Sequence, residues 1–234
     1  MQEPLSYYYN KIGFDISKIK ELICGERYLA IMLTTGEIGV CATLGKKFNI
    51  TKKDLTNINL NDFTHRTILN AYYNAILNYR NTEFINGDMM NIVDFKSFNS
   101  VVMIGYFKPI VEKLSKINVK PHIFDLRDKQ ISISIEKQPE YLQNADAVIL
   151  TATSLFNNTF ADICKHSNGD IFVLGPSSLI SPYLFKFNKV KYIFGSIFKP
   201  FDKEVLDIIG KDLGTRYFLK LGTKVGLGQS LESF

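Results

Sequence analysis

Cysteine is scarce in this sequence, and long apolar runs are missing from it. The three cysteines, Cys24, Cys41 and Cys164, are odd in number and far apart, which excludes the disulfide framework of a small secreted protein. No stretch approaches the roughly 20 apolar residues of a membrane-spanning helix, and segment 1–10 has no apolar region like that of a secretory signal. We therefore expect a cytoplasmic protein without membrane contact.

Several catalytic and metal-binding motifs are also missing. The sequence contains no G-x-G-x-x-G, P-loop, G-x-S-x-G or H-E-x-x-H motif, which argues against a standard dinucleotide site, a serine hydrolase and a zinc protease. It has no Cys-x-x-Cys or His-x-x-x-His pair, and His65, His122 and His166 fall in different predicted elements. We expect no metal held by these side chains, and the sequence identifies no cofactor.

The net charge of +5 and the pI near 8.9 raise the question of nucleic-acid binding. The lysines are scattered through asparagine- and isoleucine-rich sequence instead of forming one basic stripe, so solvated lysine faces explain the charge better. Tyr7, Tyr8 and Tyr9 do not form a stacking platform by themselves, and a mobile arm or a homo-oligomer contact explains them at least as well. We predict a small-molecule ligand as the partner.

The N-terminal part of the chain predicts a small α+β unit. From residue 21 to 44, short β-rich runs alternate with turn residues at Gly25-Glu26 and Thr35-Gly36-Glu37, which indicates antiparallel hairpins. The polar stretch 46–62 favours a loop. Apolar residues at helical spacing between 68 and 79 then predict a helix capped by Asp62 or Thr64, with one face covering the small sheet.

The C-terminal part predicts a parallel sheet with helices between its strands. Short, continuous apolar runs are typical of strands that are covered on both faces, and here they alternate with amphipathic segments. We expect a Rossmann-like, doubly wound α/β domain at 94–234 after an α+β domain at 1–93. The predicted strands are 100–104, 120–124, 147–151, 171–174 and 191–194, and the predicted helices are 108–117, 158–166, 182–187 and 203–209.

Small and polar residues follow each predicted parallel strand. Ligands of doubly wound sheets bind beyond the carboxyl ends of the strands, where such residues admit a ligand to the backbone and donate hydrogen bonds to it. The same residue types are ordinary turn and cap residues at any strand–helix junction, so both interpretations stay open. The candidates are Gly105, Tyr106, Asp125, Thr151, Thr153, Ser154, Asn157, Asn158, Gly175, Pro176, Ser177, Ser178, Gly195 and Ser196.

Asp125 is the one acidic residue among these candidates. It ends the second predicted strand about twenty residues after Gly105, where related sites place an acid on ribose hydroxyls. The alternative is a solvated loop in which Asp125 pairs with Arg127. Because the loop after the first strand has a single glycine, a nucleoside-like ligand is a better expectation here than an ordinary dinucleotide.

Several of these segments resemble one protein family. GYFKPIVEKL (105–114), ADAVILTATSLFNNTF (145–160), LGPSSLISPYLF (174–185) and IFGSIF (193–198) resemble successive motifs of the family named "putative heavy-metal chelation". TTGEIGVCATLG (34–45) resembles the start of the N-terminal domain of that family. The resemblance covers most of the chain. In contrast to the family, Asp125 stands where a glutamate is common, and the proline that often follows it is missing.

The resemblance implies an enolase N-terminal-like domain followed by a Rossmann-like domain, with a ligand site in the cleft between them. It implies condensation or hydrolysis of a pterin-, flavin- or siderophore-like metabolite, linked to heavy-metal chelation. The alternative is a non-catalytic binding protein for a metabolite or a metal chelate. To the loop residues above it adds Thr159, Asn74 and the turn that contains Glu37.

Overall fold

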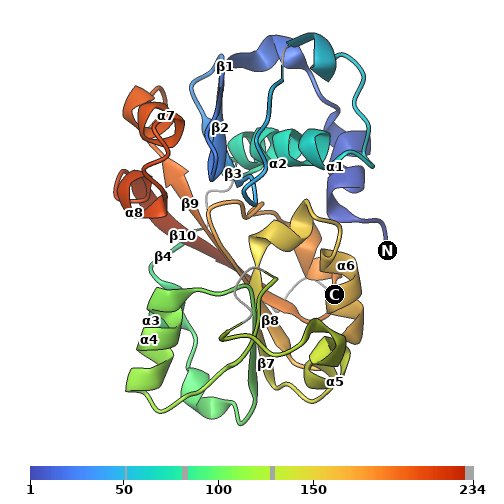
Figure 1. Cartoon of the computed structure of the whole chain (residues 1–234), viewed down its shortest axis with the longest axis vertical. Helices are drawn as coiled ribbons and strands as arrows, with labels where there is room; N and C mark the ends of the chain where they lie inside the picture. Colours follow the sequence, from blue (N-terminus) through green and yellow to red (C-terminus); the bar gives the residue numbers. More distant parts are fainter. Residues whose placement is uncertain (51, 81–83, 127–129, 230–234) are drawn as a thin grey trace.

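The chain folds into two sheets with helices packed against them (Figure 1). A computed structural model describes residues 1–50, 52–80, 84–126 and 130–229. In this part of the chain there is a three-stranded antiparallel sheet near the N-terminus and a seven-stranded mixed sheet formed by the rest. None of its helices is both long enough and apolar enough to cross a membrane.

The three-stranded sheet confirms the predicted hairpins. Its strands are β1 (Ile19–Cys24), β2 (Tyr28–Leu33) and β3 (Ile38–Ala42), in the order β1-β2-β3. The loop that follows contains a short 3₁₀ turn, η2 (Lys52–Leu55), and leads to α2 (Phe63–Leu77). Of the two predicted caps, Asp62 is the one used, because its carboxylate accepts a hydrogen bond from the His65 N–H at 2.9 Å.

Helices cover both faces of this small sheet. On one face, α2 packs against β2 and β3, and it lies so close to β3 that a Cβ at Gly39 would overlap the Ala71 carbonyl. On the other face lie α7 (Lys203–Gly210) and α8 (Thr215–Phe218) (Figure 1). Two helices from the C-terminal end of the chain therefore complete the N-terminal core.

The seven-stranded sheet has the order β4-β10-β9-β8-β7-β5-β6. Five strands confirm the predicted parallel, doubly wound arrangement: β5 (Val101–Ile104), β6 (His122–Phe124), β7 (Ala147–Thr151), β8 (Asp170–Leu174) and β9 (Val190–Phe198). The sequence did not indicate the other two, β10 (Gly222–Gly228) and β4 (Ile85–Asn86), which add antiparallel pairs beside β9. The predicted boundary between residues 93 and 94 stays a prediction.

Numbered along the chain, the five parallel strands lie in the order 2-1-3-4-5, because β6 flanks β5 on one side and β7 flanks it on the other. The direction of winding reverses between β5 and β7. Such a reversal is a topological switch point, and open α/β sheets bind their ligands outside the carboxyl ends of the strands at that point. The loops after β5 and β7 are therefore the first place to look for a ligand site.

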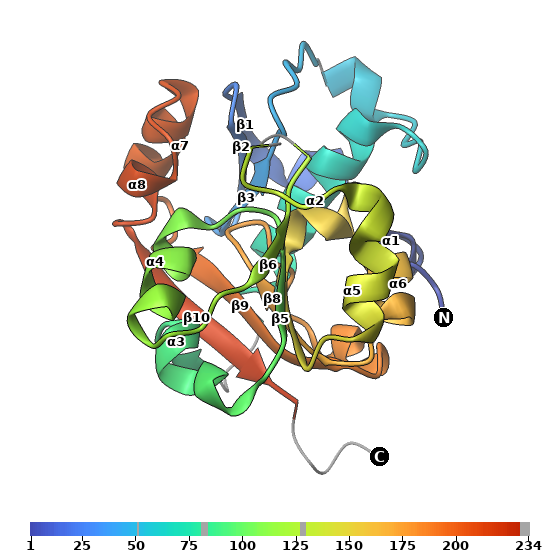
Figure 2. The same cartoon turned by 60° about the horizontal axis from the view of Figure 1, so that its bottom comes forward.

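Helices lie on both faces of the large sheet, as doubly wound sheets require (Figure 2). One face carries α3 (Met89–Ile92) and α4 (Lys108–Lys116), and the other carries α5 (Gln138–Gln143) and α6 (Phe160–His166). The predicted helix at 182–187 is a 3₁₀ helix, η6 (Pro182–Lys186). The other short 3₁₀ turns are η1 (Ile16–Lys18), η3 (Phe95–Ser97), η4 (Ile135–Lys137) and η5 (Ala152–Leu155).

The tyrosines near the N-terminus belong to a helix, α1 (Pro4–Ile12). The Tyr7 ring stacks on the Tyr183 ring with 3.5 Å between centroids, and Tyr8 is buried. The prediction of a mobile arm was wrong, because the apolar faces of these rings pack within the chain against α2 and η6. The homo-oligomer contact stays a prediction.

Candidate functional site

The loop after β8, which contains Gly175, Pro176, Ser177 and Ser178, is bound tightly to α2. The Asn74 amide nitrogen donates hydrogen bonds to the carbonyl oxygens of Pro176 and Ser178, at 3.1 and 2.7 Å. Its amide oxygen accepts from the Val40 N–H at 3.1 Å. One side chain therefore joins the loop, the helix and β3.

Two further asparagines extend this contact along α2 at intervals of one helical turn. Asn70 donates to the Ser177 carbonyl at 2.9 Å, and Asn78 donates to the Ser178 carbonyl at 3.0 Å. Asn70, Asn74 and Asn78, which we call the asparagine ladder, are all fully buried. The Ser177 hydroxyl accepts from the Ala42 N–H at 2.9 Å, and the Ser178 hydroxyl donates to the Phe194 carbonyl of β9 at 2.7 Å. The polar groups of the two serines are therefore bonded within the protein rather than directed at solvent.

The loops after β5 and β7 meet at the switch point. Gly105 has a φ of +85°, and a Cβ placed there would lie 2.9 Å from the Thr151 Cβ. Glycine therefore meets two requirements here, a left-handed backbone and a close approach to the neighbouring loop. The hydroxyls of Thr151 and Thr153 lie 3.2 Å apart, and both side chains are partly accessible to solvent.

The loop after β6 joins this group through Asp125. The Asp125 carboxylate accepts a hydrogen bond from the Tyr106 N–H at 2.8 Å, so the ends of β5 and β6 are linked directly. Asp125 is buried, and its carbonyl accepts from the Ser132 hydroxyl. The alternative partner, Arg127, lies outside the described residues. The structure brings Gly105, Tyr106 and Asp125 together at the switch point.

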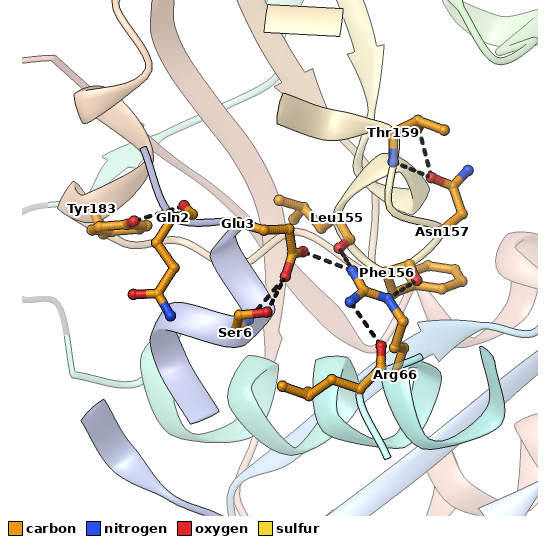
Figure 3. A network of polar contacts seen from close by, with 10 residues as sticks. Gln2, Glu3, Ser6, Arg66, Leu155, Phe156, Asn157, Thr159 and Tyr183 are labelled. Carbon is orange, nitrogen blue, oxygen red and sulfur yellow. Dashed lines mark hydrogen bonds and ion pairs between the residues drawn. The ribbon is translucent and has the colours of Figure 1, made fainter. Parts of the chain in front are cut away.

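The β7–α6 loop contains several short-range hydrogen bonds (Figure 3). The Asn157 amide oxygen accepts from the N–H and the hydroxyl of Thr159, at 3.2 and 2.7 Å, and its amide nitrogen points away from this turn (Figure 3). The Ser154 hydroxyl is buried and donates to the Thr151 carbonyl. Asn158 is exposed and adopts a φ of +67°. Thr153 and Asn157 are thus the partly exposed polar side chains of this loop.

Glu37 lies apart from these loops. It precedes β3, whereas Ala42 at the other end of that strand contacts Ser177. Its carboxylate accepts from the Thr35 hydroxyl, and the turn rests against the β9–α7 connection through a hydrogen bond from the Phe201 N–H to the Gly36 carbonyl at 2.9 Å. The structure therefore does not bring Glu37 to the switch point. Gly195 and Ser196 lie within β9, beside β10.

The helices that follow β5 and β7 begin without a side-chain cap. Among the described residues, no side chain accepts a hydrogen bond from the first turn of α4 or of α6. The starts of α5 and α8 likewise have no side-chain cap from the described residues, whereas α2, α3 and α7 are each capped by an aspartate. An uncapped helix N-terminus carries partial positive charge. In α4, however, Pro109 has no N–H and the Ile110 N–H is bonded to the Phe107 carbonyl at 2.9 Å, so this helix offers few free donors.

Comparison with known families identifies the relatives of this chain. The model of DUF364, described as "putative heavy-metal chelation", matches residues 88–225. The chain belongs to the DUF364 family. Among curated proteins, none matches.

Two solved DUF364 proteins, both described as of unknown function, share the fold. The one from Desulfitobacterium hafniense DCB-2 is 19% identical, with a TM-score of 0.78 over 96% of this chain and 98% of its own. The one from Pyrococcus horikoshii is 18% identical, with a TM-score of 0.73 over 90% and 93%. The resemblance read from the sequence and the expected fold class are confirmed.

The family description raises the question of whether this DUF364 protein holds a metal with its own side chains. Within the described ranges, no three of its His, Cys, Asp and Glu residues gather as a metal site. Burial raises the pKa of the thiols of Cys24, Cys41 and Cys164, whereas soft metals bind the thiolate. The donor set therefore does not fit a heavy-metal ion bound directly by these residues.

The sequence missed three residues that shape this part of the molecule. Asn70 and Asn78 carry a signal in their spacing, since asparagines at i, i+4 and i+8 lie on one face of a helix. Arg66 carries no such signal, because nothing in its sequence surroundings distinguishes it from a solvated arginine. In the folded chain its guanidinium is buried against the β7–α6 loop.

Proposed function

We propose that this DUF364 protein binds a small polar molecule at the β5/β7 switch point. The observation that carries the proposal is the reversal of strand order between β5 and β7, together with the contact of Gly105 with Thr151. Doubly wound sheets of the order 2-1-3-4-5 bind their ligands at this place.

The residues around the switch point support specific roles. Gly105 lets a ligand approach the backbone, and the hydroxyls of Thr151 and Thr153 and the amide of Asn157 provide donors and acceptors. Asp125 lies at the end of β6, where an acid suits a ligand hydroxyl. Loop 175–178, whose two serines are buried, supports this site by joining the sheet to α2.

The ligand class follows from the donor chemistry and the family. Since the described side chains do not fit a bare heavy-metal ion, we infer that the link to metals runs through an organic chelator. A pterin-, flavin- or siderophore-like metabolite, or its metal chelate, is the proposed ligand. Both alternatives, condensation or hydrolysis of that molecule and its non-catalytic binding, require the molecule to be bound at the switch point. We assign no catalytic residue.

The test is a thermal-shift and calorimetric screen with pterin-6-carboxylate, FMN, S-adenosylmethionine, ferric citrate and inorganic phosphate. A ligand that binds the folded state raises the melting temperature by mass action. The variant Thr153→Val removes a hydroxyl at the switch point, and Tyr106→Phe removes the hydroxyl of the tyrosine that follows Gly105. Each should weaken binding about tenfold. Mass spectrometry of the incubated mixture separates binding from conversion.

Matched controls remove the same groups elsewhere. Thr223→Val changes an exposed threonine on β10, and Tyr217→Phe changes an exposed tyrosine on α8. Both controls should bind as the wild type does. The proposal fails if no compound of the panel stabilises the protein, or if the switch-point variants and the controls respond alike.

The location and further partners also remain proposals. We propose a cytoplasmic protein, because all three cysteines are free thiols, which is typical of a reducing compartment. A small-molecule ligand is the proposed partner, and a nucleic acid is not proposed.

A further inference from the structure

The Arg66 side chain connects α2 with the β7–α6 loop. Its Nε donates to the Phe156 carbonyl at 2.7 Å, and its Nη2 donates to the Leu155 carbonyl at 3.1 Å (Figure 3). Its Nη1 donates to the Leu60 carbonyl at 3.2 Å. The side chain is only 7% exposed, so these carbonyls replace water as partners of a nearly buried guanidinium.

The charge of Arg66 is balanced by a residue from the N-terminal helix. The Glu3 carboxylate lies 2.7 Å from Arg66 Nη2, and its other oxygen accepts from the N–H and the hydroxyl of Ser6, at 2.9 and 3.0 Å. Glu3 thus caps α1 and pairs with Arg66 at once. The start of α1 is held in turn by the Tyr183 hydroxyl, which donates to the Gln2 carbonyl at 2.8 Å.

Two of the three carbonyls that Arg66 binds, those of Leu155 and Phe156, belong to the residues immediately before Asn157. Fixing the carbonyls of Leu155 and Phe156 fixes the peptide planes that lead into the Asn157–Thr159 turn. A planar guanidinium with several donors suits this task, because it sets the direction of more than one acceptor, whereas a lysine ammonium is a point charge. The described hydrogen bonds therefore run from α1 through Glu3 and Arg66 to the loop.

We propose that Arg66 is a positioning residue, which, held by Glu3, orders the β7–α6 loop so that Thr153 and Asn157 are presented at the switch point. Its significance for a ligand rests on the proposed function. The ordering of the loop does not, and it is measured without any ligand. Failure of the ligand screen and failure of this proposal are therefore distinguishable.

Hydrogen exchange followed by mass spectrometry tests the proposal on the full chain. In Glu3→Gln, which keeps an oxygen for the Ser6 cap but removes the charge, amides of residues 153–159 should exchange about tenfold faster. Arg66→Met should accelerate the exchange of these amides more than Glu3→Gln does. Arg66→Lys should have an effect between those of Glu3→Gln and Arg66→Met. Amides of β7 should keep the wild-type rate. Glu3 acts on the loop through Arg66. The double variant Glu3→Gln/Arg66→Met should therefore exchange these amides little faster than Arg66→Met alone.

The control is Glu21→Gln, which breaks the ion pair between Glu21 on β1 and Lys203 on α7. It should leave the exchange of residues 153–159 unchanged. If Arg66→Met does not fold, Glu3→Gln and Arg66→Lys decide the question. Wild-type exchange of the loop in both variants overturns the proposal, and so does an equal acceleration in the loop and in β7, because that result indicates only a general loss of stability.

Discussion

Three loops at the same edge of the large sheet have similar residues and different surroundings. The loop after β8 contains Gly175, Ser177 and Ser178, and the two serines are buried. The loops after β5 and β7 contain Gly105, Thr151 and Thr153, which keep some access to solvent. The asparagine ladder of α2 bonds the Pro176, Ser177 and Ser178 carbonyls of the first loop, and the two serine hydroxyls are bonded as well. In the β7–α6 loop, α2 bonds two backbone carbonyls through Arg66 and leaves the Thr153 side chain partly accessible.

This comparison separates two uses of polar residues at strand ends. A buried polar loop stabilises the joint between the sheets, because a buried donor or acceptor that loses its partner costs free energy. An accessible polar loop keeps part of its hydrogen-bonding capacity for a ligand. Three predictions probe this difference.

The largest effect is expected from Asn74→Ala. Removing this amide leaves the Val40 N–H and the Pro176 carbonyl without their partner in a buried place, which should lower the free energy of unfolding by about 3 kcal/mol. Urea denaturation measures the change. The exposed Asn144→Ala serves as control and should stay within about 0.5 kcal/mol of the wild type. Equal effects of the two would contradict the structural role of the ladder.

An acid titration distinguishes the neutral asparagine ladder from a charged joint elsewhere. Asp88 lies 2.9 and 2.8 Å from the Nζ atoms of Lys113 and Lys224 and joins α3, α4 and β10. Burial alone would raise the pKa of Asp88, but the hydrogen bonds from Lys224 and Lys113 outweigh it and lower the pKa from 3.8 to about 2.

Because the folded pKa is lowered, this carboxylate stabilises the fold above pH 4, and the contribution is lost as pH falls through 2. At pH 5 the free energy of unfolding of the wild type should exceed that of Asp88→Asn by about 2 kcal/mol. This difference should disappear as the pH approaches 2. Denaturant unfolding at each pH measures it. The Val40 N–H, which the ladder binds, should stay protected from hydrogen exchange between pH 5 and pH 2, because asparagine side chains do not titrate. A gap that is constant with pH would count against the lysine contacts.

The smallest effect compares one hydroxyl in each region. Ser177→Ala leaves the buried Ala42 N–H without its acceptor and should cost about 1.5 kcal/mol. Thr153→Val removes a partly exposed hydroxyl and should cost less than about 0.5 kcal/mol. Thermal unfolding of both variants measures the difference. If Thr153→Val proves the more costly, the roles of the two loops are reversed.

Much of the fold was predictable because buried strands and helices have local patterns of apolar residues in the sequence. The five parallel strands appear as continuous apolar runs, and Asp62 stands at the start of the α2 pattern. In contrast, β10 is glycine-rich, with Gly222, Gly226 and Gly228, and β4 is two residues long, so neither has a pattern of its own. They are strands because of their neighbours. The tyrosines of α1 likewise become core residues only when η6 and α2 pack against them.

The candidate site was predictable as an edge of the sheet but not as a set of side chains. Strand order decides which loops meet, and nothing local in the sequence states that β5 lies between β6 and β7. Whether a serine is buried also depends on a distant segment, as Ser177 and Ala42 show. Glu37 was included in the site because of the family resemblance. It precedes β3, at the end of the strand opposite to Ala42, and therefore lies away from the switch point. The assigned site residues themselves stay predictions.

The covering of the N-terminal sheet by α7 and α8 has a consequence for synthesis of the chain. Ala30, Met32, Ile38 and Val40 form an apolar surface whose partners, Val205, Leu206, Ile209 and Phe218, come from the end of the sequence. At translation rates of about 5–20 residues per second, these partners follow roughly 10–40 s later. During that interval the apolar face of the β1–β3 sheet is exposed on the nascent chain. The N-terminal core is therefore complete only after α7 and α8 have been synthesised.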